Sequence, residues 1–319
     1  MKTSRIWTAL VCCGIALMMN AQVINSINDQ NMRKGFEKQQ QAEQAEKLRQ
    51  QRPQRTKLDP NVTIDTTTVY FALVDSAQHC INSQNWGGAE AFILRAIASE
   101  PHNENNSLLL SNLGTLQRYQ GKFAEALKNY SMALDLTPNA VTLLHNRAAL
   151  LVTLDSLPRA QRDYERIMQL DPADTEARYD HGMVAFEMGE VTTARDDFEW
   201  LLRLDPMSWQ GHHGMAMLHK AVGDYEKAVS HLSDAIKVAP SAALLGHRAD
   251  CYLMRRRLAD ASEDIAQALQ LDAEDPFLYV LRAKLNKLRY NFEDVKRDME
   301  LAEKYGISKS VVKQLLEGE

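Results

Sequence analysis

The chain has 319 residues, 45% hydrophobic and 25% charged, with a formal net charge of -5. Its apolar content is enough to bury a substantial core, and a chain of this length ordinarily forms about two domains. Residues 61 to 319 carry a net charge of about -10, which argues against binding to nucleic acid, because contacts with phosphates need clustered Lys and Arg.

The first residues are typical of a secretory signal peptide. Lys2 and Arg5 precede an apolar run from Ile6 to Met19, and the small residue Ala21 follows. The run has 14 residues, fewer than the about 20 that a membrane-spanning helix needs. We therefore expect residues 1–21 to be cleaved off. The mature protein should be periplasmic or secreted, in a bacterial cell envelope, and not an integral membrane protein.

Residues 22–60 form a segment that cannot build a core. Seven glutamines lie between Lys38 and Gln54, with Lys and Glu among them and almost no apolar residue. This composition predicts a Gln-rich tether or an exposed helix. Beyond it, Cys80 and Cys251 are the two cysteines that remain after cleavage, and we expect them to be buried thiols rather than a disulfide.

From about Tyr70 the sequence predicts helix after helix, divided by short turns, with residues recurring at a fixed period. A proline that ends the second helix of a unit recurs with this period, and we call these residues the exit prolines. The last three steps between them are equal: Pro101, Pro138, Pro172, Pro206 and Pro240. Small residues recur in a first column at Gly114, Ala148, Gly182, Ala216, Ala249 and Ala283, and in a second at Ala126, Ala160, Ala194, Ala228 and Ala261. Small side chains at these places let two helices cross closely.

This pattern resembles the tetratricopeptide repeat family, whose unit is a helix pair of about 34 residues, here of an exported bacterial type. The resemblance implies an all-α fold, a right-handed α-solenoid of about 6–7 repeats over residues 61–306. Units start at Ser107, Val141, Thr175, Trp209 and Ala242, with poorer copies at each end. Asp155 and Arg256 replace the turn glycine. Residues 307–319 are expected to form a C-terminal capping helix.

In this family the first helices of the units line a concave groove that binds a protein or peptide partner. The side chains predicted to line it here are Asn112, Tyr119, His145, Asn146, Tyr179, Asp180, Met183, Phe186, His213, Met217, His247, Asp250 and Met254. For Phe186 and Met254, packing between helices is an equal alternative. The family's grip on a partner's terminal carboxylate is matched only at Asn146, because Glu176 and Asp180 stand where basic residues would be wanted.

Histidines recur near one place on successive first helices, at His145, His213 and His247, with His181 and His212 nearby. A shared metal site is disfavoured, because packed helices lie about 8 to 10 Å apart and zinc holds its nitrogen ligands at about 2.0 Å. We expect them to hydrogen-bond instead. The sequence therefore predicts no metal and no cofactor.

No catalytic motif stands in the mature chain: GxSxG, GxxxxGK[ST], GxGxxG, HExxH and CxxC are all missing. Carboxylate pairs such as Asp196 with Asp197 and Glu263 with Asp264 fall on second helices, where solvated surface is expected. The sequence predicts a non-enzymatic interaction scaffold or adaptor. Two alternatives stay open: a self-associating structural component of an envelope assembly, and an enzyme or metal binder with an unrecognised site.

Overall fold

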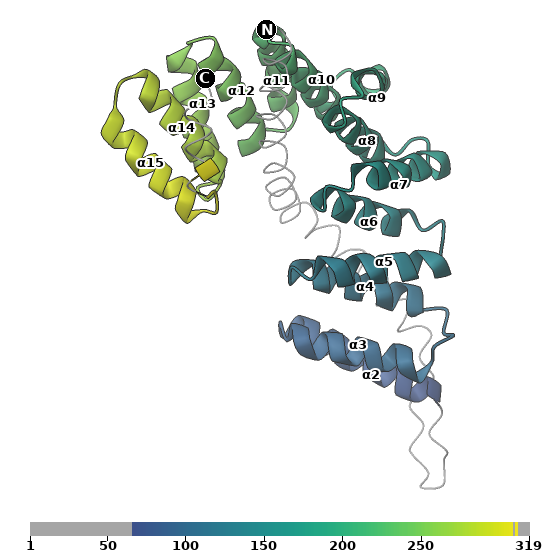
Figure 1. Ribbon diagram of the computed structural model, residues 1–319. Helices are drawn as coiled ribbons and strands as arrows, with labels where there is room; N and C mark the ends of the chain where they lie inside the picture. The colour runs from purple at the N-terminus through teal and green to yellow at the C-terminus, as the bar shows by residue number, and fades with distance from the viewer. Residues whose placement is uncertain (1–65, 309, 312–319) are drawn as a thin grey trace. The chain divides into compact units, whose positions relative to one another are not determined.

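A computed structural model describes residues 66–308, 310 and 311, and within them every regular element is a helix (Figure 1). The helices are α2 (Thr66–Asn82), α3 (Trp86–Ser99), α4 (Asn106–Tyr119), α5 (Phe123–Leu136), α6 (Val141–Thr153), α7 (Leu157–Leu170), α8 (Thr175–Glu187), α9 (Val191–Leu204), α10 (Trp209–Ala221), α11 (Tyr225–Val238), α12 (Ala242–Met254), α13 (Leu258–Leu271), α14 (Pro276–Leu288) and α15 (Phe292–Lys304). The expected signal peptide, the tether and most of the capping helix lie outside the described residues.

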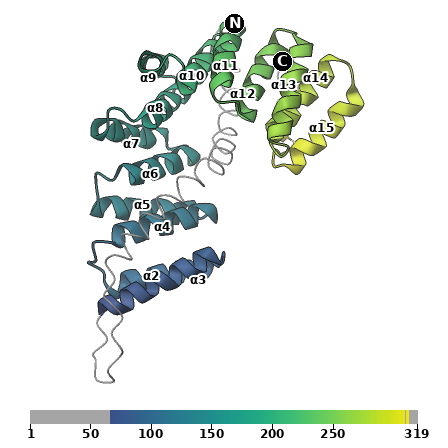
Figure 2. The same ribbon diagram turned by 180° about the vertical axis from the view of Figure 1, so that it is seen from behind.

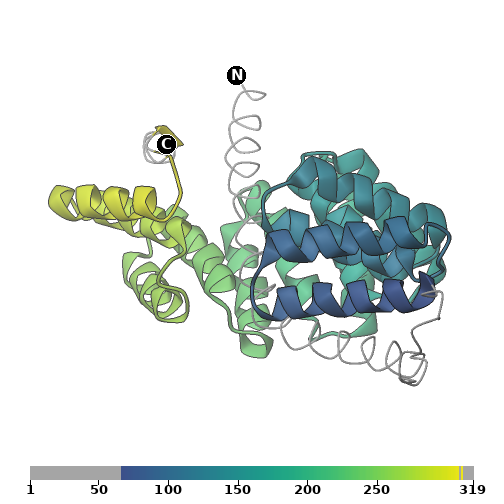
Figure 3. The same cartoon turned by 90° about the horizontal axis from the view of Figure 1, so that it is seen from below.

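The described helices divide into two compact units, with the boundary between Ala173 and Asp174. The N-terminal unit contains α2 to α7, and the C-terminal unit contains α8 to α15. Within each unit, consecutive helices pack as pairs, of which α4 with α5 and α14 with α15 are clear in opposite views (Figures 1 and 2). Figure 3 shows the first pair, α2 and α3, along its length. The all-helical prediction is confirmed, with seven pairs in the described residues.

Most first helices begin at the residue that the repeat spacing predicts, and α2 begins four residues earlier, at Thr66. Four of them start at Val141, Thr175, Trp209 and Ala242. In the C-terminal unit a polar residue directly before each first helix accepts a hydrogen bond from a backbone N–H of the first turn; these caps are Asp174, Ser208, Ser241 and Asp275. Such a side chain satisfies an amide that the helix leaves unpaired. The N-caps therefore repeat at almost the same period as the exit prolines.

The small residues lie where the paired helices cross. Every alanine of the predicted second column has a fully buried side chain: Ala126, Ala160, Ala194, Ala228 and Ala261. In the first column, Gly114 faces the ring of Tyr130, and an added Cβ would stand 2.8 Å from it. A larger side chain at these positions would hold the helix axes apart. Cys80 and Cys251 are buried free thiols, as expected.

Each turn inside a helix pair contains one residue in the left-handed backbone region, whether or not it is glycine. These residues and their φ angles are Gln84 (59°), Gly121 (73°), Asp155 (54°), Gly189 (78°), Gly223 (80°), Arg256 (57°) and Tyr290 (62°). The turn geometry is thus kept in the units that lack the glycine. The hydrogen bond from the Arg257 amide to the Tyr252 carbonyl, 2.9 Å, has its counterpart at Gly189, where Glu190 donates to Ala185 over 2.8 Å.

Arg256→Gly should stabilise the protein by about 0.5 to 1 kcal/mol. A left-handed backbone costs a non-glycine residue about 1 to 2 kcal/mol, and relief of that strain outweighs the greater chain entropy that glycine gives the unfolded state. The matched control is Arg255→Gly, since Arg255 has a φ of -92°, and glycine there should instead destabilise. Chemical unfolding measures both. Equal effects of the two substitutions would contradict the strain argument.

Candidate functional site

The two helices of several repeats are joined by an ion pair between an arginine and a buried aspartate, and in three of these pairs the arginine stands 16 residues before the aspartate. Arg248 on α12 donates two hydrogen bonds to Asp264 on α13, from Nε to Oδ2 at 2.8 Å and from the terminal nitrogen to Oδ1 at 2.7 Å. Arg147 holds Asp163 in the same two-point way, at 2.8 and 2.7 Å. We call these contacts the seam pairs.

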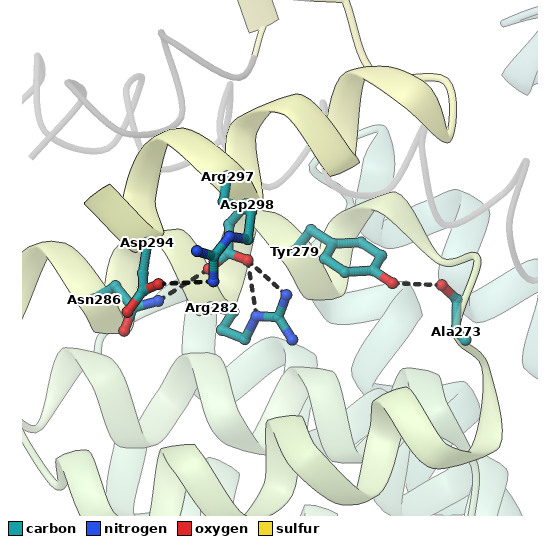
Figure 4. A network of polar contacts seen from close by, with 7 residues as sticks. All are labelled: Ala273, Tyr279, Arg282, Asn286, Asp294, Arg297 and Asp298. Carbon is teal, nitrogen blue, oxygen red and sulfur yellow. Dashed lines mark hydrogen bonds and ion pairs between the residues drawn. The ribbon is translucent and has the colours of Figure 1, made fainter. Parts of the chain in front are cut away.

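Two further seam pairs vary this pattern. Arg282 binds one oxygen of Asp298, whose other oxygen accepts from Asn286 at 2.9 Å (Figure 4). Asp197 accepts from Arg178 at 3.1 Å, and its second oxygen lies 2.5 Å from Nδ1 of His181. The guanidinium of Arg178 also lies over the ring of Trp200.

The expectation that the paired carboxylates of second helices are solvated was half wrong. Asp196 and Glu263 are exposed, but Asp197 is only 4% exposed and Asp264 only 3%. The reason is that the aspartates face the first helix of their own repeat, where arginine pairs with them. An interval of 16 residues between Arg and Asp recurs in three repeats and could have revealed Asp264 in the sequence, but Arg178 stands 19 residues before Asp197.

The predicted groove residues of the N-terminal unit lie on α4 and α6, which contact one another. We call Asn112, Tyr119, His145 and Asn146 the N-terminal face. Asn112 is exposed, the Tyr119 side chain is 64% exposed, and the other two are half-buried. The guanidinium of Arg118 lies 5.2 Å from the Tyr119 ring centroid. An aromatic ring with a cation beside it is a common anchor in protein interfaces.

The predicted groove residues of the C-terminal unit are mostly buried, which corrects the picture of an open surface there. Less than a tenth of the residue is exposed at Tyr179, Phe186, His213, Met217, His247 and Asp250, while Asp180 and Met183 are half-buried and Met254 is exposed. Successive first helices contact each other directly, α8 with α10 and α12 with α14. Side chains at these positions therefore pack between helices, and truncating Tyr179 or His213 would change stability before it changed binding.

Four of the buried rings form a row along successive first helices of the C-terminal unit. The Tyr179 hydroxyl and Nδ1 of His213 are hydrogen-bonded at 2.8 Å, the His213 and His247 rings lie 5.2 Å apart, and His247 lies 6.3 Å from Phe277. Burial, with the charge of Lys220, lowers the pKa of His213 to about 4. Side chains from successive first helices therefore contact one another. The sequence analysis considered only the distance between helix axes and did not predict these contacts.

Beside this row an ion network joins three first helices. Nζ of Lys220 on α10 lies 2.6 Å from one oxygen of Asp250 on α12, and Nζ of Lys284 on α14 lies 3.9 Å from the other. Burial alone would raise the pKa of Asp250, but the two lysines outweigh it and hold the pKa below its ordinary value. The sequence analysis singled out Asp250 but missed both lysines. The network stabilises the packing of successive repeats.

Paired helices with small residues at the crossings define a helical-repeat protein, and comparisons with known proteins specify the family. Residues 153–214 and 213–276 match two family profiles described as tetratricopeptide repeat. A crystal structure of a tetratricopeptide repeat protein from Parabacteroides merdae ATCC 43184 is 32% identical with a TM-score of 0.70, covering 78% of this chain and 98% of that one. The chain belongs to the tetratricopeptide repeat family.

More distant solved structures share the fold alone. The Cut9–Hcn1 hetero-tetramer of the APC/C is 14% identical with a TM-score of 0.56, covering 72% of this chain and 52% of that chain. PilW, a type IV pilus biogenesis factor, is 18% identical with a TM-score of 0.50, covering 64% of this chain and 93% of that one. No curated protein sequence matches this chain significantly.

Proposed function

We propose that this protein is a non-enzymatic scaffold or adaptor that binds a protein or peptide partner through the N-terminal face. The proposal rests on Tyr119, a large aromatic side chain that is 64% exposed on the first helix α4. Exposed Asn112 and half-buried Asn146 stand on the same pair of first helices and offer hydrogen bonds around the ring. Anchors of this kind dominate binding energy in protein interfaces.

Family membership supports the same function. Tetratricopeptide repeats typically bind protein or peptide partners through their first helices, and the N-terminal face stands on two first helices. The polar side chains of the N-terminal face suit a peptide, whose backbone carries both donors and acceptors.

A photo-crosslinking amino acid placed at position 119 tests the proposal in the native cell. It should capture a discrete partner that mass spectrometry identifies. The matched control is position 132, since Met132 is 41% exposed but stands on the second helix α5. Equal capture at both positions would contradict binding through the N-terminal face.

The identified partner then allows affinities to be measured. Tyr119→Ala should weaken binding by about 2 kcal/mol, or about 30-fold, as expected of a truncated interface anchor. Met132→Ala should leave affinity unchanged, and both variants should unfold at nearly the wild-type temperature because both side chains are exposed. If Tyr119→Ala lost both its binding and its fold, Tyr119 would be needed for stability, which would contradict its role as a binding anchor alone.

We propose, too, that the protein acts in the cell envelope after removal of residues 1–21. The charged start and short apolar run support export. Among the described helices, none is long and apolar enough to cross a membrane. N-terminal sequencing of protein from cells tests export: a mature start at Gln22 is expected, and cytoplasmic protein that begins at Met1 or Lys2 would contradict it.

A further inference from the structure

Three histidines of the C-terminal unit meet at the seam between α10 and α11. We call His212 and His219 on α10 and His231 on α11 the histidine cluster. Nδ1 of His212 lies 3.0 Å from Nδ1 of His231, and the ring of His219 stacks on that of His231 at 5.5 Å and 12°. His212 and His231 are half-buried, and the side chain of His219 is 18% exposed, so small ions in solvent can reach the cluster.

The cluster occupies a place where the preceding repeat has a seam pair. His212 stands one repeat period after Arg178, and His231 stands one repeat period after Asp197. Arginine and aspartate at these positions join the two helices by a direct ion pair of 3.1 Å. In this repeat both charges are replaced by imidazoles, a change that gives up the ion pair and gains two nitrogen ligands.

The hydrogen bonds of His212 orient its ring. Nε2 lies 3.1 Å from the carbonyl oxygen of Pro206, which can only accept, so Nε2 carries the proton. In the neutral ring Nδ1 is then unprotonated and faces His231. A histidine whose second nitrogen donates to a backbone carbonyl is the usual arrangement of a metal ligand, since that bond fixes the tautomer and the direction of the ring.

We propose that the histidine cluster binds a divalent transition-metal ion, with Nδ1 of His212 and Nδ1 of His231 as its first two ligands and His219 as the third. Two nitrogens about 2.0 to 2.1 Å from a tetrahedral zinc lie about 3.3 Å from each other. The observed 3.0 Å needs to open by only a few tenths of an ångström, with a tilt of the two rings. When the ion binds, the proton on Nδ1 of His231 moves by way of solvent to Nε2 of the same ring, so that both neutral rings offer an unprotonated Nδ1.

His219 completes the site by rotating about its side-chain bonds. Its Nδ1 now lies 3.9 Å from Oδ2 of Asp224, so the ring turns away from this carboxylate when it joins the ion. Imidazole ligands without thiolates suit Zn²⁺, Cu²⁺ and Ni²⁺. Three histidines leave a fourth position to water. The metal would then join α10 to α11 in place of the missing seam pair.

Isothermal titration of the full chain with Zn²⁺, after removal of any affinity tag, tests the proposal. The wild-type protein should bind about one equivalent, as for a single tetrahedral site. His212→Asn combined with His231→Asn should abolish this binding, and His219→Asn alone should weaken it by about tenfold or more. The matched control, His79→Asn with His102→Asn, removes two exposed histidines of the N-terminal unit and should change nothing.

Circular dichroism verifies that each variant is folded. A second measurement, by nuclear magnetic resonance, uses the wild-type chain alone. Substoichiometric Cu²⁺ added to the wild-type chain should broaden the imidazole resonances of His212, His219 and His231 before those of His79 and His102. Absence of binding, binding that survives loss of both His212 and His231, or broadening that begins elsewhere would each overturn the site. In that case the two rings serve only as a hydrogen-bonded pair.

Discussion

Phe198→Ala is expected to lower the free energy of unfolding by about 3 to 5 kcal/mol, as large-to-small changes at buried aromatic positions do. Phe198 on α9 is fully buried and packs in the core between α8 and α10. Its ring lies against two glycines of those helices: an added Cβ at Gly182 would stand 2.6 Å from it, and one at Gly214 would overlap it as well. Chemical unfolding measures the loss.

A double-mutant cycle tests whether position 214 requires glycine because the Phe198 ring fills the space beside it. Gly214→Ala alone should destabilise by about 1 to 3 kcal/mol through overpacking. In the Phe198→Ala background it should be neutral or stabilising, because the space is free and alanine favours helix by about 1 kcal/mol. Phe292→Ala is the matched control, since Phe292 is 59% exposed in the same unit. Additive effects of the two substitutions would rule out the contact as the cause.

Asp264→Ala should destabilise the protein by about 3 kcal/mol, because it leaves the guanidinium of Arg248 without its carboxylate in a partly buried seam. Asp264 is 3% exposed, and the Arg248 side chain is 19% exposed. Asp260→Ala on the same helix is the matched control. It removes an ion pair with Arg257 whose side chains are 39% and 46% exposed, and such solvent-screened pairs contribute little to stability.

Removing both charges separates the effect of an unpaired Arg248 guanidinium from the simple loss of side-chain contacts. Arg248→Met combined with Asp264→Leu should recover most of the stability, since a buried ion pair and a well-packed apolar pair of similar volume are often close in free energy. Thermal unfolding at neutral pH compares the wild type, Asp264→Ala, Asp260→Ala and the double variant. A double variant as unstable as Asp264→Ala would show that the seam requires the ion pair itself.

Much of the fold could be predicted from local pattern. The starts of α6, α8, α10 and α12 follow from the repeat period, because each repeat is one helix pair and needs the same turn and crossing residues. Three of the four seam pairs could have been predicted too, since their arginine and aspartate stand 16 residues apart, whereas Arg178 and Asp197 stand 19 residues apart. What a period cannot state is how a turn survives without glycine: Asp155 and Arg256 adopt the left-handed backbone because the packing of both helices demands it.

The candidate site depended far more on tertiary structure. The sequence by itself determined which residues stand on the first helices, because that is a matter of position within a repeat. Only the tertiary structure decided that Tyr119 is exposed while His213 and His247 are buried, since exposure depends on how closely the next first helix packs. It likewise brought His231 on α11 to His212 on α10. A hydrogen bond between side chains of two helices is set by ring direction, and local sequence does not specify that direction.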